Sequence, residues 1–101
     1  MSVLMTLRVQ GDPAKLEQYA SQNQDKMAEI AERGRAAGAT SHRFYGSENG
    51  TILVVDEWDS PEGFRSFFES DEDIPAMMQE IGVTSEPEIT FWRKLTTYDE
   101  F

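Results

Sequence analysis

The sequence predicts an α+β fold with the ferredoxin-like order β-α-β-β-α-β and a four-stranded antiparallel sheet. Three observations support this prediction. Apolar residues alternate with others in four short segments, which is typical of strands. Two longer segments repeat apolar residues every three or four positions, which indicates helices. Each half of the chain contains a strand, a helix that begins at a proline, and a second strand.

In the first half, residues 2–10 alternate and predict the first strand. Asp12 and Pro13 then predict a helix start, because an Asp side chain caps free amide groups and a Pro at the first position loses no needed donor. The apolar spacing extends this helix over residues 13–35. Residues 40–46 predict the second strand.

In the second half, Asn49-Gly50 is a strong hairpin signal before a third strand at residues 51–58. Ser60 and Pro61 repeat the helix-start pattern. The helix they begin is interrupted at residues 70–73. A shorter helix at 74–82, a fourth strand at 88–95 and a tail at 96–101 follow, so residues 1–95 are expected to form a single domain.

Composition excludes several classes of protein. The chain has 101 residues, 39% of them hydrophobic, which argues against wholesale disorder. It has no Cys and a net charge of -10, so disulfides are absent and nucleic acid is not an expected partner. No apolar run approaches the roughly 20 residues of a membrane span, and the N-terminus does not resemble a signal peptide. A cytoplasmic location is expected.

The predicted sheet is apolar on both faces. In the third strand, Ile52 and Val54 point to one side, and Leu53 and Val55 to the other. Helices on one side cannot cover both faces, and large exposed apolar patches are rare in monomers. We therefore expect a homodimer in which a second copy covers the free face.

Four segments carry a family resemblance: residues 42–46, the turn at 49–50, residues 55–64 and residues 88–93. Through them, residues 2–95 resemble the antibiotic biosynthesis monooxygenase-like domains of the dimeric α+β barrel superfamily. The resemblance implies a homodimer whose sheets pack into a barrel, with a pocket between each sheet and its helices. Members include cofactor-free oxygenases of polyketide quinols, haem-degrading monooxygenases and proteins without an assigned reaction.

The residues argue against the haem-degrading branch. Its helical Trp would fall near Phe67, and its iron-binding His near Met77 or Met78. The single His of this chain, His42, lies on a different element. No cofactor is therefore expected. Asp71-Glu72-Asp73 lacks the Gly and Glu spacing of a calcium loop, so it is interpreted as a solvated loop and no metal site is expected.

The resulting hypothesis is a cofactor-independent monooxygenase that acts on a small aromatic or quinol-type ligand. The catalytic candidates are His42 as a base, with Arg43 and Tyr45. The candidates for substrate binding are Tyr19, Asn23, Trp58, Phe64, Phe67, Met77, Trp92 and Arg93.

Structural interpretations stay open beside these roles. His42 can be a half-buried strand residue hydrogen-bonded to the backbone. The arginines can pair with acids across the sheet, and the aromatic residues can be core or dimer contacts. The alternative function is a non-catalytic homodimer that binds a small molecule or serves a structural role.

Overall fold

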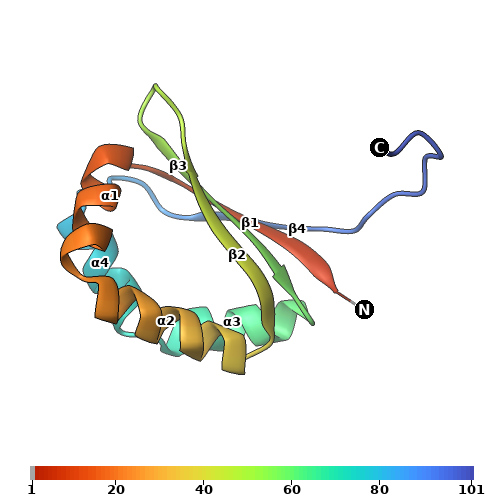
Figure 1. The fold of residues 1–101 in the computed structure, drawn as a ribbon, viewed down its shortest axis with the longest axis horizontal. Helices are drawn as coiled ribbons and strands as arrows, with labels where there is room; N and C mark the ends of the chain where they lie inside the picture. The colour runs from red at the N-terminus through yellow and green to blue at the C-terminus, as the bar shows by residue number, and fades with distance from the viewer. Residues whose placement is uncertain (1) are drawn as a thin grey trace.

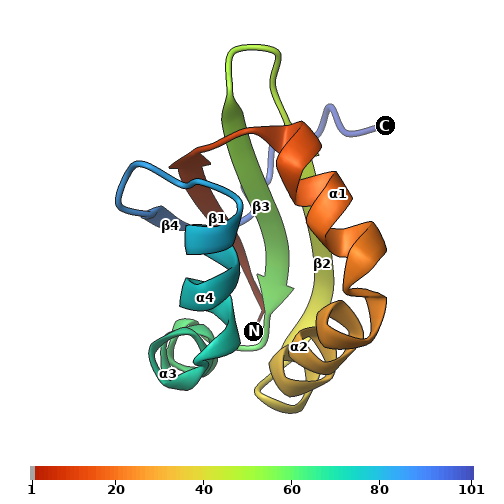
Figure 2. The ribbon, with the colours of Figure 1, turned by 90° about the vertical axis from the view of Figure 1, so that its left-hand side faces the viewer.

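The computed structural model describes residues 2–101, so the first residue of the expected domain lies outside the described residues. Four antiparallel strands form one sheet, and four helices lie on one of its faces (Figures 1 and 2). The strand order is β2-β3-β1-β4, so the ferredoxin-like prediction is confirmed. The elements are β1 (Val3–Gln10), α1 (Pro13–Gln22), α2 (Gln24–Ala36), β2 (Ala39–Gly46), β3 (Thr51–Trp58), α3 (Pro61–Ser70), α4 (Asp73–Glu80) and β4 (Glu88–Trp92).

Both predicted helix starts are confirmed by their hydrogen bonds. The Asp12 carboxylate accepts a bond of 2.9 Å from the amide of Ala14. The Ser60 hydroxyl accepts one of 3.2 Å from the amide of Gly63. These caps satisfy amide groups that have no partner inside the first turn.

The prediction of one helix over residues 13–35 is wrong, because two helices meet at Asn23. Its backbone leaves the helical region, with φ -133° and ψ 45°. Its side-chain amide donates a hydrogen bond of 2.9 Å to the carbonyl of Tyr19. A short polar side chain can thus satisfy the backbone locally and end a helix whose apolar spacing continues.

Two other boundaries also differ from the predictions. The fourth strand ends at Trp92 rather than at residue 95, and the last helix spans Asp73–Glu80 rather than 74–82. Beyond β4 the chain runs away from the sheet (Figure 1), and its apolar side chains Leu95, Tyr98 and Phe101 are exposed. No helix within residues 2–101 has the length and apolar character needed to cross a membrane.

The two faces of the sheet have different surroundings. Met5, Leu7 and Val54 are buried on the face that the helices cover. On the other face, called the open face below, Leu4, Tyr45 and Trp92 are 37%, 54% and 51% exposed. The predicted alternation along the strands is therefore confirmed, and no part of residues 2–101 covers the open face.

Trp58 anchors the helices to the sheet. It is 1% exposed at the end of β3, and its ring meets that of Phe64 edge to face at 5.4 Å. Phe67, one turn further along α3, lies 5.7 Å from the same indole. Edge-to-face aromatic contacts add to the stabilisation that comes from burial alone. Helix α3 is thereby held against the last residue of β3.

An ion-pair cluster joins the helices on their outer side. The Arg33 guanidinium of α2 lies 2.7 Å from both Asp71 and Asp73, and Lys26 lies 3.3 Å from Asp73. The Asp71 carboxylate also accepts the backbone amides of Asp73 and Ile74, which begin α4. The prediction of a solvated loop is wrong for Asp71, because only 2% of its side chain is exposed.

This cluster predicts a pH-dependent contribution to stability. Hydrogen bonding to Arg33 lowers the pKa of Asp71 below its ordinary value of 3.8, although burial opposes this shift. A carboxyl whose pKa is lower in the folded state than in the unfolded state stabilises the fold at pH values above its unfolded-state pKa. This stabilisation is lost as the pH falls through the folded-state pKa. Arg33→Gln should lower the melting temperature near pH 7 by on the order of 5 °C.

Thermal melts followed by circular dichroism between about pH 7 and pH 2 test this prediction. The difference between wild type and Arg33→Gln should narrow below about pH 4. Arg35→Gln is the matched control, because Arg35 pairs with Glu32 of its own helix. An equal loss in both variants, or a loss that does not change with pH, would contradict the proposed role of Asp71.

Candidate functional site

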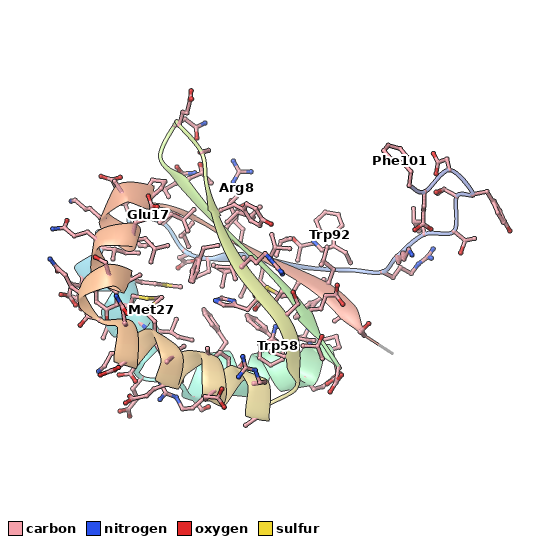
Figure 3. The ribbon with its side chains drawn as sticks, in the orientation of Figure 1. Arg8, Glu17, Met27, Trp58, Trp92 and Phe101 are labelled. Carbon is pink, nitrogen blue, oxygen red and sulfur yellow. The ribbon has the colours of Figure 1, made fainter. Side chains whose placement is uncertain are left out.

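A cavity of about 280 Å³ lies between the covered face of the sheet and the helices α2, α3 and α4. Aromatic and methionine side chains make up much of its wall, including Phe44, Phe64 and Phe67 and the flexible Met27 and Met77. Figure 3 shows Met27 and Trp58 on this side of the sheet, whereas Arg8 and Trp92 lie on the other. An apolar cavity of this size suits a small planar ligand.

The wall contains two ionisable residues, His42 of β2 and Asp56 of β3. They are paired in the strand register, and His42 Nδ1 lies 2.6 Å from Asp56 Oδ1. The second carboxylate oxygen accepts a 3.0 Å hydrogen bond from the Trp58 indole. Asp56 thus uses both oxygens, as a buried carboxylate must if its desolvation is to be offset.

This arrangement determines which nitrogen of His42 is free. An ionised carboxylate can only accept hydrogen bonds, so Nδ1 carries the proton that is shared with Asp56. In the neutral imidazole, Nε2 is then an unprotonated acceptor. The His42 side chain is 44% exposed, whereas that of Asp56 is only 7% exposed. His42 is therefore positioned at the cavity wall as a proton acceptor with a buried carboxylate behind it.

The structure brings together five of the residues that the sequence suggested. His42, Trp58, Phe64, Phe67 and Met77 all line the cavity. The interpretation of His42 as bonded to the backbone does not describe this structure, because its observed partner is the Asp56 side chain.

The other six candidates lie elsewhere. Tyr19 is buried in the core, and Asn23 lines a separate shallow groove on the helices. Arg43 and Tyr45 alternate with His42 along β2 and lie on the open face, where Arg43 donates to the Ser41 hydroxyl. Trp92 is also on the open face, with its indole bonded to Thr6, and Arg93 follows the end of β4.

Asp56 is the residue of the candidate site that the sequence prediction did not include. The signal was its position, because it alternates with Val54 and Trp58 and so places a charge on the covered face of a strand. A charge at such a position needs a partner from a neighbouring element.

The His42–Asp56 pair gives the site a group that can accept a proton. Across residues 2–101, no three His, Cys, Asp or Glu side chains come together in a way that could hold a metal ion.

Comparison with known proteins identifies the fold. No protein-family model and no curated protein matches the chain. Among solved structures, SnoaB, a cofactor-independent oxygenase from Streptomyces nogalater, is similar over 98% of both chains with a TM-score of 0.63 and 16% identity. The ActVA-Orf6 monooxygenase of Streptomyces coelicolor, solved with nanaomycin D, has a TM-score of 0.67 and 18% identity, over 99% of this chain and 93% of its own.

A dimeric ferredoxin-like protein from an uncultured marine organism is also similar, with a TM-score of 0.63 and 18% identity over 99% of this chain and 93% of its own. The resemblance to antibiotic biosynthesis monooxygenase-like domains is therefore confirmed at the level of the fold. Fold alone does not assign a reaction.

The His42–Asp56 pair predicts one tautomer. Because the chain has a single histidine, its ring nitrogens can be assigned without ambiguity by ¹⁵N NMR. In the neutral ring of the wild type, the proton should lie on Nδ1. Asp56→Asn should increase the Nε2-protonated form. A carboxylate can only accept a hydrogen bond from Nδ1, whereas the Asn side chain can also donate one to an unprotonated Nδ1. A wild-type ring protonated mainly on Nε2 would contradict the hydrogen bond inferred here.

Proposed function

We propose that the protein is a cofactor-independent monooxygenase that oxidises a small phenolic or quinol-type aromatic compound in the cavity. The observation that carries this proposal is the His42–Asp56 pair in an otherwise apolar wall. A base beside an apolar pocket is suited to a substrate that is planar, mostly hydrophobic and able to lose a proton.

The chemistry requires little else from the protein. His42 Nε2 accepts the proton of a substrate hydroxyl, and the Asp56 carboxylate stabilises the resulting imidazolium. The substrate anion is electron-rich and transfers electrons to O₂. For an anthrone-type substrate, whose hydroxyl form is the enol of a ring ketone, the ring CH₂ group of the keto form becomes a carbonyl, one oxygen atom of O₂ enters that carbonyl, and the other leaves as water. The substrate supplies all four electrons, so no external reductant is required.

The apolar wall supports this role in two ways. Among the described residues, the only ionisable groups of the wall are His42 and Asp56, so the imidazolium is the charged partner of the substrate anion. The flexible side chains of Met27 and Met77 can adapt to the outline of a planar ring. The descriptions of SnoaB as a cofactor-independent oxygenase and of ActVA-Orf6 as a monooxygenase agree with this reaction class.

Oxygen uptake tests the proposal. With an anthrone, wild type should consume O₂ above the buffer rate. His42→Ala should lower kcat/KM by about 10²- to 10⁴-fold, which is the usual contribution of a positioned base. A panel of such substrates that gives no uptake while a ligand still binds would favour the non-catalytic binding function instead.

Arg43→Gln shows which face of the sheet carries the reaction. Arg43 is adjacent to His42 in the chain, but its side chain lies on the open face. Retention of the rate in Arg43→Gln supports the cavity as the site. An equal loss in both variants would indicate that the open face takes part in the reaction.

We further propose that a second copy of the chain covers the open face. Leu4, Tyr45 and Trp92 are exposed there, and the half-buried Leu53 and Val55 lie between them. Covering such an aromatic and aliphatic sheet face offers a stable interface of roughly 800 Å² per partner. The similar marine protein is described as dimeric, which agrees with this proposal.

Light scattering after size exclusion tests the dimer. At micromolar concentration, wild type should have twice the 11.5 kDa mass of one chain. Leu53→Glu places a charge in the centre of the open face and should give a monomer. Glu57→Gln, on the same face but exposed, should remain a dimer. A single-chain mass for wild type would contradict the proposal.

A further inference from the structure

The charges around the cavity carry a further inference about its ligand, which rests on the proposed function. None of the nine Lys and Arg residues lines the cavity within residues 2–101. The His42–Asp56 pair has a net charge of -1 with a neutral imidazole and of zero with an imidazolium. The net charge of the cavity wall is therefore negative or zero, and it is never positive.

The cations on α2 and α3, two of the helices that line the cavity, are already engaged in contacts. Arg33 and Lys26 are bound to Asp71 and Asp73 on the outer side of the helices. Arg65 of α3 lies over the ring of Phe91, 4.9 Å from its centroid. Moving any of them to a ligand in the cavity would break these contacts.

The positive, N-terminal end of α4 is also occupied. Ile74, in the first turn of α4, lines the cavity. The exposed amides of such a turn favour anions. Here the Asp71 carboxylate accepts the amides of both Asp73 and Ile74, and so supplies that negative charge from within the chain.

We infer that the cavity selects uncharged hydroxyaromatic ligands and rejects those that carry a carboxylate. A carboxylate in this cavity would lose water and gain no Lys or Arg partner from residues 2–101, and the one cation available, the His42 imidazolium, is already balanced by Asp56. A substrate built with a carboxyl group must therefore have lost or esterified that group before it reaches this protein. Decarboxylation or ester formation is the class of reaction that supplies such a substrate.

Three naphthalene ligands separate charge from size. They are 2-naphthol, 6-hydroxy-2-naphthoic acid and the methyl ester of that acid. Isothermal titration calorimetry with the full chain near pH 7.5 should show binding of the naphthol and the ester. The acid should bind at least about 30-fold more weakly than the ester, which corresponds to a modest part of the shift seen for buried carboxylates. Equal binding of the acid and the ester would overturn the inference.

The other outcomes are equally decisive. Weak binding of both the acid and the ester beside tight binding of the naphthol would show that size selects the ligand, which also overturns the inference. Binding of none of the three would remove both the inference and the cavity as the site of the proposed function. Selective binding of the neutral pair without oxygen uptake from any quinol would support the inference and refute the oxygenase.

A pair of variants tests the physical cause. Met27 lines the cavity from α2, and a Lys side chain at this position can lie along the apolar wall and present its ammonium group to a ligand. The preference for ester over acid should be at least about 10-fold smaller in Met27→Lys than in Met27→Gln, which has similar length but no charge. An unchanged preference would overturn the electrostatic explanation.

Discussion

The buried carboxylate of Asp56 is the group on which the site depends. It binds His42 through one oxygen and the Trp58 indole through the other. Removal of either partner would leave one oxygen of a buried carboxylate without a hydrogen bond, which is a costly defect in a protein interior. The same carboxylate therefore orients a potential base on β2 and a large aromatic anchor on β3.

This pairing connects the site to the fold. His42 and Asp56 meet only because β2 and β3 pair in one register, with an irregularity between Ala39 and Ser41. A shift of one residue would move His42 to the open face, away from Asp56. Trp58 in turn packs against Phe64 and Phe67, so the position of α3 over the cavity depends on the same end of β3.

Each face of the sheet has a different proposed function. The covered face provides an apolar cavity with one proton-accepting group, and the open face provides the surface for a second copy. The acidic side chains at the helix ends and in the tail lie outside both regions. The net charge of -10 is thus compatible with a cavity wall that holds one carboxylate and an open face that exposes Leu4, Tyr45 and Trp92.

Much of the fold could be predicted from the sequence, because strand alternation, the Asn49-Gly50 turn and the two proline-led helix starts are local signals. The break at Asn23 could not, since it depends on a side-chain bond to Tyr19 that competes with a continuing apolar pattern. Asp71 was misassigned for a similar reason. Its burial depends on Arg33, which lies 38 residues away in the chain.

The candidate site was predictable only in part. The spacing of aromatic and methionine residues indicates a covered apolar layer. His42, the single histidine of the chain, is a candidate base from the sequence alone. The partner of His42 depends on strand register, which composition does not determine. The same register separates Arg43 and Tyr45 from the cavity, because adjacent strand residues point to opposite faces.

A crystal structure of the protein with 2-naphthol bound tests the central claim most directly. The account predicts the naphthalene rings inside the cavity beneath α2 and α3, with the hydroxyl oxygen within about 3 Å of His42 Nε2. Ligand density confined to the open face, or a ligand in the cavity whose hydroxyl points away from His42, would contradict it.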